Sequence, residues 1–417
     1  MSKLIITGGK RLEGEIEVQG AKNDVLPILA ATVLNGGKNI IYNCPRLRDV
    51  SKTVEVLRML GCRAERLDKT ILVDSSDMNG YTIEEGLMRQ MRSSIIFLGA
   101  ILARCKKAVV SMPGGCEIGN RPIDLHLKAL RELGVEIEEN HGYIHCNAEH
   151  LAGARIHLDF PSVGATENIM LAASMAEGTT VISNAAREPE IEDLEVFLNH
   201  MGAKISGAGT DVIQIEGVDK LYGVEHTIIP DRIAAGTYLA AAAITGGSVV
   251  LRNVCPRHMQ AMLTALSEMG STLYIEKNRI IITPGKRLQG LDLIRTMPYP
   301  GFPTDIQSPF MALCCAAEGS SMFVENIFEN RFQHVEELAR MGADIKVDGR
   351  VAVVRGVEKL SGAKVVAKEL RGGAALIVAA LAAEGTTEIE QVHYIDRGYE
   401  SPERILQACG ANIRRKE

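Results

Sequence analysis

Apolar and polar positions along the chain repeat with a period of about seventy residues. Each copy has an apolar segment of small residues, a Gly turn, a β-rich strand, an Asn-containing turn, an amphipathic helix and a closing strand after Gly-Ala or Gly-Cys. The copies at 168–205, 308–345 and 375–413 are clear, and weaker ones begin near residues 26, 94 and 236. The glycines that end the second helix lie 68–73 residues apart, at Gly61, Gly134, Gly202, Gly270, Gly342 and Gly410.

Each copy predicts two helices of different kinds. The first, such as Thr166–Glu177, is apolar on nearly every side, which is typical of a helix buried all round. The second, such as Val335–Met341, carries charges on one face and is expected to cover the outside. Strands such as Thr180–Ser183 and Ser321–Val324 lie between them. The pattern therefore predicts sheets wrapped around central helices.

Six copies, divided three and three, predict two similar α/β domains. A chain of 417 residues is long enough for two cores, since single cores stop growing at roughly 250–300 residues. Pro230-Asp231-Arg232 follows a predicted strand and precedes the fourth copy, so we expect the hinge there. The domains would be 22–229 and 1–21 plus 230–417. The strand Glu15–Gln19 belongs to no complete copy and is expected to complete the last sheet of the second domain.

Composition excludes several classes of protein. Hydrophobic residues make up 46% of the chain and charged residues 24%, and no apolar run approaches the roughly 20 residues of a spanning helix. The net charge is −6 with no basic tract, so neither nucleic acid nor a membrane is an expected partner. Nine cysteines lack metal-ligand spacing. We expect a cytosolic protein without an obligatory protein partner.

The second copy carries an insert that breaks the pattern, about 112–122, with three glycines and two prolines around Cys116. Such a loop is mobile yet limited in its conformations, and it exposes its cysteine. Arg121 nearby would favour the thiolate. The residues leave open whether Cys116 is functional or incidental.

Cations recur at the starts of the apolar helices and at strand ends. Lys22 and Asn23 follow Gly20-Ala21 just before an apolar helix, where a helix N-terminus suits phosphate or carboxylate. Most exposed arginines are solvated surface. Six cations at equivalent places, however, indicate an anionic ligand that arginines grip with two parallel hydrogen bonds. Further cations at these places are Arg92, Arg232, Arg331, Arg371 and Arg397.

Asp305 lies in a stiff proline-rich loop, at the end of Pro298–Asp305. By sequence alone we expect it to cap the helix that follows, since Asp is a preferred N-cap residue. A catalytic role is compatible with capping. A carboxylate with a pKa near 3.9 is a weak base, so it would need a late or environment-tuned proton transfer.

Seven segments in order along the chain resemble the UDP-N-acetylglucosamine 1-carboxyvinyltransferase family. That family's fold is two inside-out α/β barrel domains of three units each, the EPSP synthase-like fold, with the active site in the cleft between them. The resemblance implies transfer of the enolpyruvyl group of phosphoenolpyruvate to the sugar's 3-hydroxyl, in peptidoglycan synthesis. It implies no metal or organic cofactor. The segments are GAKN (20–23), PGGCEIGNRPIDLH (113–126), SVGAT (162–166), NAAREPEI (184–191), FPTD (302–305), ENRF (329–332) and DRGYE (396–400).

The resemblance also implies roles for single residues. Cys116 would protonate the methylene carbon of phosphoenolpyruvate and would be the target of fosfomycin. Asp305 would take the proton of the sugar hydroxyl. Lys22, Arg121 and Arg397 would hold phosphate and carboxylate, with Arg331 and Arg371 as further anion-binding cations. The expected UDP-sugar contacts are Asn23, Arg92, Arg121, Pro122, Ile123, Asp124, Leu125, Ser162, Val163, Gly164 and Ile327.

Three positions depart from the family's common pattern. Phe160 stands where many members have a lysine, Glu369 replaces an aspartate, and Tyr394 stands where His is usual, with His393 one place earlier.

Because Cys116 would act as a thiol in acid catalysis, activity should fall on the alkaline side of its pKa.

Three alternatives remain. The sister enolpyruvyl transferase of the shikimate pathway shares the repeats, but it has a Gly-Asn-Ala-Gly-Thr signature where this chain reads Met91-Arg92-Ser93-Ser94. A catalytically silent paralogue that senses nucleotide sugar would be free to lose Cys116 and Asp305. An RNA-end-processing enzyme is disfavoured by the acidic charge balance.

Overall fold

The computed structural model describes residues 2–112, 123–283, 285 and 287–417. These residues form two compact units, each with its own hydrophobic core. One unit contains residues 20–112 and 123–229, and the other contains residues 2–19 and 230–417. Cys116, Arg121 and Pro122 lie outside the described residues.

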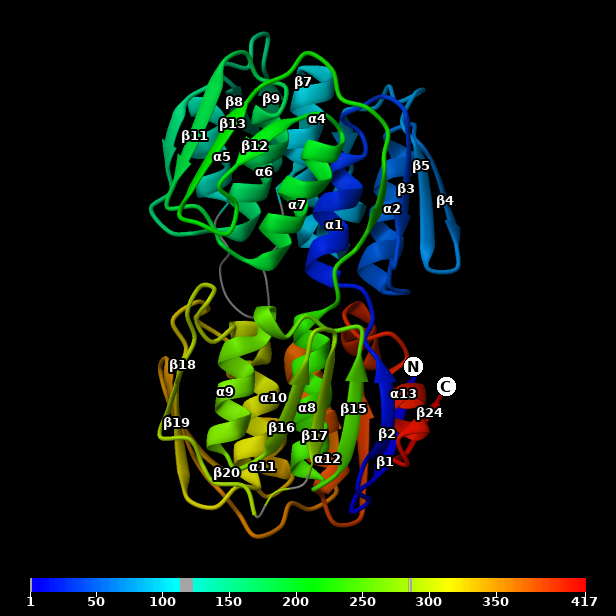
Figure 1. Ribbon diagram of the computed structural model, residues 1–417, viewed down its shortest axis with the longest axis vertical. Helices are drawn as coiled ribbons and strands as arrows, with labels where there is room; N and C mark the ends of the chain where they lie inside the picture. Colours follow the sequence, from blue (N-terminus) through cyan, green and yellow to red (C-terminus); the bar gives the residue numbers. More distant parts are fainter. Residues whose placement is uncertain (1, 113–122, 284, 286) are drawn as a thin grey trace. The chain divides into compact units, whose positions relative to one another are not determined.

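The first unit is built around helices that are buried on all sides. Its central helices are α1 (Lys22–Ala31), α4 (Phe97–Cys105) and α6 (Val163–Ala173), with α4 packed against both others (Figure 1). Nearly all their residues are buried, which agrees with their mostly apolar sequences; the buried polar residues Asp24, Glu167 and Asn168 lie toward the helix starts. The remaining helices are α2 (Arg48–Met59), α3 (Glu85–Gln90), α5 (Asp124–Glu132), α7 (Pro189–His200) and the 3₁₀ helix η1 (Arg92–Ile96).

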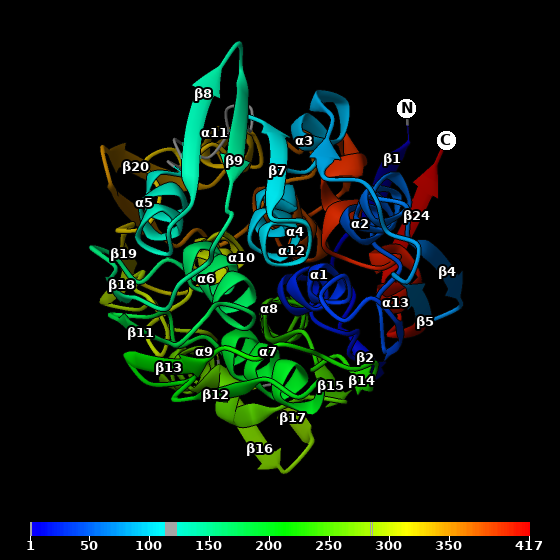
Figure 2. The same cartoon turned by 90° about the horizontal axis from the view of Figure 1, so that it is seen from above.

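Three four-stranded sheets surround these helices among the described residues of the first unit. In each sheet one edge strand pairs in parallel with its neighbour (β14 with β3, β6 with β7, and β10 with β11), and the other neighbouring strands are antiparallel. The hairpin β8–β9 reaches out beyond its sheet (Figure 2). The strand orders are β14 (Glu225–Thr227), β3 (Lys38–Tyr42), β5 (Thr70–Asp74), β4 (Arg63–Leu67); β6 (Thr82–Ile83), β7 (Lys107–Ser111), β9 (Tyr143–Asn147), β8 (Glu136–Asn140); and β10 (Arg155–His157), β11 (Thr179–Ser183), β13 (Val212–Glu216), β12 (Lys204–Ser206).

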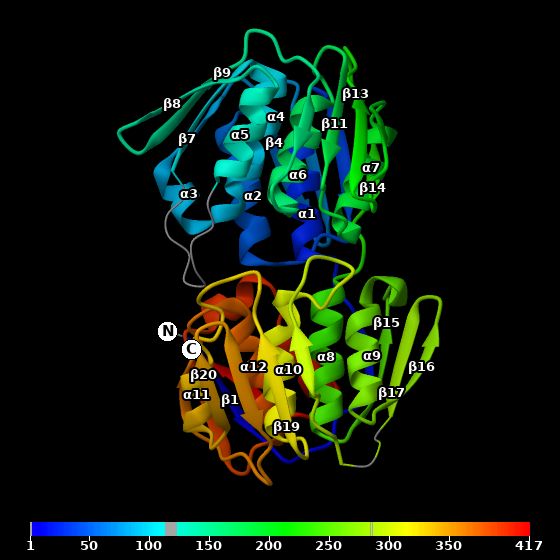
Figure 3. The same cartoon turned by 90° about the vertical axis from the view of Figure 1, so that its left-hand side faces the viewer.

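The second unit repeats this plan. Its central helices are α8 (Arg232–Ile244), α10 (Thr304–Cys315) and α12 (Leu370–Ala382), and each packs against the other two (Figure 3). The outer elements are α9 (Gln260–Glu268), α11 (Val335–Arg340), α13 (Pro402–Ala408) and the 3₁₀ helices η2 (Pro256–Met259) and η3 (Val392–Arg397). The starts of α10 and α12 carry the charged residues described below.

The sheets of the second unit include both strands of the N-terminal segment. Their orders are β16 (Thr272–Glu276), β17 (Arg279–Thr283), β15 (Ser248–Arg252), β2 (Glu13–Glu17); β18 (Leu293–Arg295), β19 (Ser320–Val324), β21 (Val351–Arg355), β20 (Asp344–Asp348); and β22 (Lys364–Val366), β23 (Thr386–Glu390), β1 (Lys3–Thr7), β24 (Asn412–Lys416).

The expected pairing of the N-terminal strand is wrong. The strand predicted at Glu15–Gln19 is β2, Glu13–Glu17, and it pairs in parallel with β15 in the fourth copy's sheet. The last sheet is completed by β1, which lies between β23 and β24. Leu4 and Ile6 alternate with exposed or half-buried neighbours and are fully buried, so this short segment has the pattern of a strand that covers a core on one face.

The glycine spacing is confirmed by the backbone. All six helix-ending glycines have positive φ, between 89° and 104°. L-residues rarely adopt this conformation, whereas glycine does so without a steric cost. The first helix of the third copy begins earlier than predicted, at Val163, because Ser162 caps it. No helix in the described part of the chain is long and apolar enough to cross a membrane.

Candidate active site

In the first unit, Lys22 is the first residue of α1 and lies where the helix N-terminus and a cation were expected together. Its Nζ is 3.1 Å from Oδ2 of Asp49, in the first turn of α2, and both side chains are largely buried. Asn23 follows it and is half-buried. The contact ties the starts of α1 and α2 and fixes the direction of the Lys22 side chain.

The starts of α5 and α6 lie side by side. Ser162 caps α6, accepting a hydrogen bond from Ala165 N at 3.3 Å. A Cβ on Gly164 would lie 3.0 Å from Cε1 of His126, in the first turn of α5, so glycine permits this approach. The structure thereby brings Gly164, one of the predicted residues 162–164, close to His126, which directly follows the predicted residues 123–125.

His126 was not singled out by the sequence, although it ends one of the seven segments. Its Nδ1 is 2.8 Å from Nδ2 of Asn168, which also donates to Ile95 O at 3.0 Å. Asn168 Oδ1 accepts from Gly99 N at 2.7 Å. Because the Asn168 amide donates on this side, Nδ1 of His126 accepts and the ring proton lies on Nε2. Asn168 thus joins α4, α5 and α6 to Ile95 of η1. Arg92 is the first residue of η1, and its side chain lies outside the described part.

In the second unit, Asp305 is clamped by two buried guanidinium groups. Its Oδ1 accepts from Arg331 Nη2 at 3.0 Å and its Oδ2 from Arg371 Nη2 at 2.9 Å. The Arg331 and Arg371 side chains are 1% and 3% exposed, whereas that of Asp305 is 26% exposed. A carboxylate that is held from two sides and is still 26% exposed can accept a hydrogen bond from a ligand hydroxyl.

The expectation that Asp305 caps its helix is wrong. The N-cap of α10 is Pro303, and Asp305 is the second helical residue, so its carboxylate points to the arginines instead of to the helix backbone. Glu369 is the residue that caps, accepting from Arg371 N at 2.7 Å and from Gly372 N at the start of α12. Its Oε2 is also 3.8 Å from Arg331 Nη1. Glu369 therefore holds both arginine-bearing segments in place.

The predicted contact Ile327 is linked to the start of α10 through Glu325, which the sequence did not single out. Glu325 is buried, and its Oε1 accepts from Ile327 N at 2.8 Å and Phe328 N at 3.0 Å. Its Oε2 accepts from Thr304 Oγ1 at 3.0 Å. Glu325 follows β19, at the turn that recurs in each copy; that position was the signal that could have found it.

The electrostatics of this cluster favour the charged form of Arg371 and the neutral form of His334. Burial is the largest single influence on Arg371 and lowers its pKa, but Asp305, Tyr399 and Asp231 together outweigh burial and raise the pKa of that guanidinium. Burial, and then Arg331, lowers the pKa of His334 to about 3. Arg397 is the last residue of η3 and is half-buried; its neighbour Asp396 pairs with Arg415 at 2.7 Å. Among the described residues, no group of three or more His, Cys, Asp or Glu side chains is placed to hold a metal.

Comparison with known proteins identifies the class. The sequence model of the family described as EPSP synthase (3-phosphoshikimate 1-carboxyvinyltransferase) matches residues 6–406, so the chain belongs to this family. The enolpyruvyl transferase NikO of Streptomyces tendae has the same fold, with a TM-score of 0.90 and 25% identity over 100% of this chain and 99% of that one. The EPSP synthase of Acinetobacter baumannii, at 19% identity, shares the fold with a TM-score of 0.76 over both full chains. The predicted fold is thereby confirmed.

Full-length relatives narrow the class further. UDP-N-acetylglucosamine 1-carboxyvinyltransferase 2 of Caldanaerobacter subterraneus subsp. tengcongensis is 58% identical over 413 residues, covering 99% of each chain. UDP-N-acetylglucosamine 1-carboxyvinyltransferase 1 of Symbiobacterium thermophilum is 52% identical over 99% of this chain and 95% of its own. The resemblance that the seven segments indicated is confirmed.

Proposed function

We propose that the chain transfers the enolpyruvyl group of phosphoenolpyruvate to the 3-hydroxyl of UDP-N-acetylglucosamine and releases phosphate. This is the first committed step of peptidoglycan synthesis. The observation that carries the proposal is 58% identity, over 99% of both chains, to an enzyme named for that reaction. Because both substrates are charged phosphate esters, which do not cross a bilayer unaided, we place the reaction in the cytosol.

The reaction needs an acid at one carbon and a nucleophile at the next. The sugar hydroxyl oxygen forms a bond to C2 of phosphoenolpyruvate, its proton goes to Asp305, and Cys116 gives a proton to C3. The resulting intermediate then loses a proton from C3 and breaks its bond between C2 and the phosphate oxygen. Lys22, Arg121 and Arg397 would stabilise the departing phosphate. The hydrogen bonds from Arg331 and Arg371 support the role of Asp305 as the proton acceptor, because they hold its carboxylate in a fixed orientation.

Residues of both units take part in this proposal. Residues 22–229 would supply Lys22, Asn23, Arg92 and the segments 121–125 and 162–164, and residues 230–417 would supply Asp305, Ile327 and the arginines. The approach of Gly164 to His126, which directly follows residues 123–125, supports the assignment of 123–125 and 162–164 to the same ligand, the UDP-sugar. Arg331 and Arg371 are engaged with Asp305, so we assign them to its orientation as well as to anion binding.

The test is phosphate release from phosphoenolpyruvate with UDP-N-acetylglucosamine or shikimate 3-phosphate as acceptor, for the unchanged protein and for Cys116→Ala. We expect release with the UDP-sugar alone, and its loss in the variant. Release with shikimate 3-phosphate would assign the chain to the sister activity. Binding of the UDP-sugar without release by either acceptor would identify a silent paralogue.

A further inference from the structure

The turn after β19 differs from the equivalent turn in other copies of the repeat. In three of them an asparagine directly follows the corresponding strand, with a left-handed backbone (φ 53–57°). Its side-chain amide donates to the carbonyl that directly follows the neighbouring parallel edge strand. Glu325 has this place in the fifth copy, and its φ is not positive. The three asparagine bonds are Asn43 to Ile228 O at 2.9 Å, Asn184 to Leu158 O at 2.7 Å and Asn253 to Val18 O at 2.8 Å.

The fifth copy joins this turn to its edge strand through another residue. Thr296 directly follows β18, and its Oγ1 accepts from Asn326 N at 2.9 Å. The backbone N–H of Thr296 donates to Val324 O at 3.0 Å. The connection that an asparagine side chain makes in the other copies is thus present without the side chain of Glu325. Glu325 is therefore available for different contacts.

The Glu325 side chain accepts hydrogen bonds from two segments of the candidate site. Its Oε1 accepts from the backbone N–H groups of Ile327 at 2.8 Å and Phe328 at 3.0 Å. Its Oε2 accepts from Oγ1 of Thr304, the first residue of α10, at 3.0 Å. Glu325 is 1% exposed, so water does not compete for these bonds. One side chain therefore fixes the distance between the segment 327–328 and the start of α10.

The same two segments also meet at Arg331. Its guanidinium carbon lies 5.6 Å from the centre of the Phe328 ring. Its Nη2 donates to Thr304 O at 3.2 Å and to Asp305 Oδ1 at 3.0 Å. Glu325, Phe328, Arg331 and Thr304 therefore form a closed ring of contacts, and Asp305 directly follows Thr304. A displacement of Glu325 reaches Asp305 by two routes, through Thr304 and through Phe328 and Arg331.

We propose that Glu325 is a positioning residue that links the binding of the UDP-sugar at Ile327 to the orientation of Asp305. The inference rests on the proposed function, in which Ile327 contacts the UDP-sugar and Asp305 takes the proton of its hydroxyl. Because one carboxylate holds both segments, the sugar contact and the proton acceptor keep a fixed spacing. A misplacement of about 1 Å can cost on the order of a hundredfold in rate, so Glu325 affects kcat as well as binding.

The experiment measures kcat, the KM of both substrates and, by titration calorimetry, the dissociation constant of the UDP-sugar. Glu325→Ala removes all three accepted hydrogen bonds. We expect it to raise the KM of the UDP-sugar on the order of tenfold and to lower kcat on the order of ten- to a hundredfold, with the KM of phosphoenolpyruvate within about threefold. Glu325→Gln keeps an oxygen that can accept from Ile327 and Phe328, so its dissociation constant should return to within about threefold of the unchanged protein. Thr304→Val breaks only the bond to α10 and should lower kcat without weakening the binding of the UDP-sugar.

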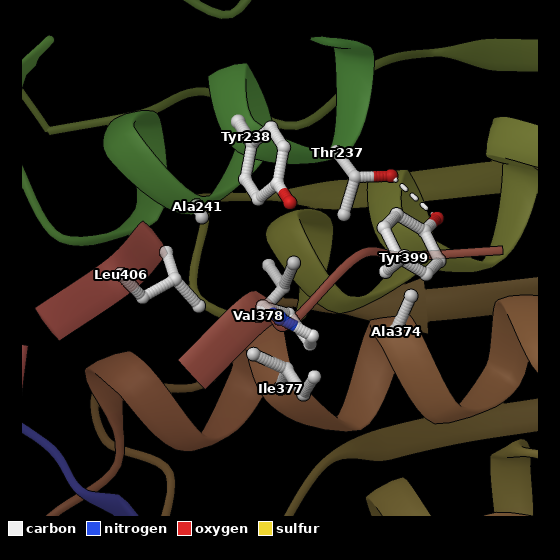
Figure 4. A pocket seen from close by; sticks show the side chains of 9 residues that line it. Thr237, Tyr238, Ala241, Ala374, Ile377, Val378, Tyr399 and Leu406 are labelled. Atoms are coloured by element: carbon white, nitrogen blue, oxygen red, sulfur yellow. Dashed lines mark hydrogen bonds between the residues drawn. The ribbon is translucent and has the colours of Figure 1, made fainter. Parts of the chain in front are cut away.

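Two controls lie in the same unit. Asn253→Gly removes the corresponding side-chain hydrogen bond in the fourth copy, and glycine tolerates the positive φ. Tyr238, on α8, lies beside the hydrogen-bonded pair Thr237 and Tyr399 in a small cavity lined mainly by apolar side chains (Figure 4). The Tyr238 hydroxyl has no hydrogen-bond partner in the part of the chain that the structure describes, so Tyr238→Phe removes a buried oxygen without breaking a bond. Both controls should leave kcat and both KM values unchanged.

The split between the two substrates separates positioning from a general structural defect. An equal rise in both KM values for Glu325→Ala would mean that the residue only stabilises the unit, and would overturn the proposal. If Glu325→Ala does not fold, Thr304→Val decides, since a kcat equal to that of Tyr238→Phe would remove the link to Asp305. An unchanged protein that released no phosphate would refute the proposed function first. An active protein in which Glu325→Ala behaves like Asn253→Gly would refute this inference alone.

Discussion

Replacing Asp305 by Asn tests the clamp directly, because the two side chains have the same shape and differ in charge. The variant keeps one oxygen, so it accepts from one arginine and presents its amide to the other. Loss of a hydrogen bond to a charged group costs about 1.5–3 kcal/mol, and breaking a buried ion pair costs about 3–5 kcal/mol. The loss of stability should lie at the lower end of the second range for two reasons. Asp305 is 26% exposed, so water screens its charge, and Glu369 remains 3.8 Å from Arg331 as a second negative partner. We expect about 3 kcal/mol.

That loss is measurable in the unfolding of the unit that contains residues 230–417. For a unit of this size, about 3 kcal/mol corresponds to a melting temperature roughly 6–12 °C lower, followed by scanning calorimetry. Asp344→Asn is the control, since Asp344 is exposed on β20 and should change stability by no more than about 0.5 kcal/mol. In the phosphate-release assay, loss of a general base should lower kcat by about 10²- to 10⁴-fold.

Two results would refute the reasoning. A melting temperature within a degree or two of the Asp344→Asn control would mean that the buried arginines do not depend on the carboxylate. A destabilised variant with less than a tenfold loss of kcat would confirm the clamp but remove Asp305 from the chemistry, and the acceptor of the hydroxyl proton would have to be sought elsewhere.

Three further changes test separate features. Glu369→Ala removes the cap of α12 and should cost about 0.5–2 kcal/mol in urea unfolding, with Glu369→Asp retaining most of the stability. Gly99→Ala should cost 1–3 kcal/mol or more, since its Cβ would lie 2.2 Å from a backbone oxygen of α6; Gly86→Ala, with open space, is the control for the calorimetric comparison. Burial, and then Asp193, raise the pKa of Asp24 well above its ordinary value, so the native state holds a proton that the unfolded chain has lost. The free energy of unfolding should therefore fall as the pH rises above about 4. Asp24→Asn is neutral at every pH, so urea titrations of this variant at several pH values should show no such fall. A fall as large as that of the unchanged protein would show that Asp24 does not cause the pH dependence.

The repeat made most of the fold predictable, because all six copies have the same pattern of apolar and polar positions. An element that is ambiguous in one copy could be assigned from the others. The buried helices and the positive φ of the helix-ending glycines could be predicted from the sequence. A helix that is apolar on all sides is typical of a buried helix, and a glycine directly after a helix is typical of a left-handed cap. The N-terminal strands could not be assigned correctly. Strand pairing between β1 and β24 joins residues that are about 400 positions apart, and no local pattern specifies such a partner.

The candidate site was predictable in its residue types and only partly in its contacts. Lys22 and Ser162 lie at helix starts, as the positions of the apolar segments indicated. The roles of Glu325 and His126 were missed because each acts through a hydrogen bond to a partner distant in the sequence, and that bond exists only after packing. A single chain carries no sign of these pairings.

Comparison of the three central helices in the second unit explains why the Asp305 carboxylate contacts arginines instead of the helix backbone. At the start of α8, Asp231 is the N-cap and accepts from Ile233 N and Ala234 N, each at 2.9 Å. At the start of α12, Glu369 has the same role. In α10 the N-cap position is taken by Pro303, which has no side-chain acceptor, and the acidic residue comes two places later. The shift removes Asp305 from the helix backbone, where its oxygens would accept from N–H groups as in the other two copies, and turns them toward Arg331 and Arg371. Among these three helix starts, the contacts of the acidic residue therefore depend on its position relative to the first helical residue, as a cap at Asp231 and Glu369 and as an arginine partner at Asp305.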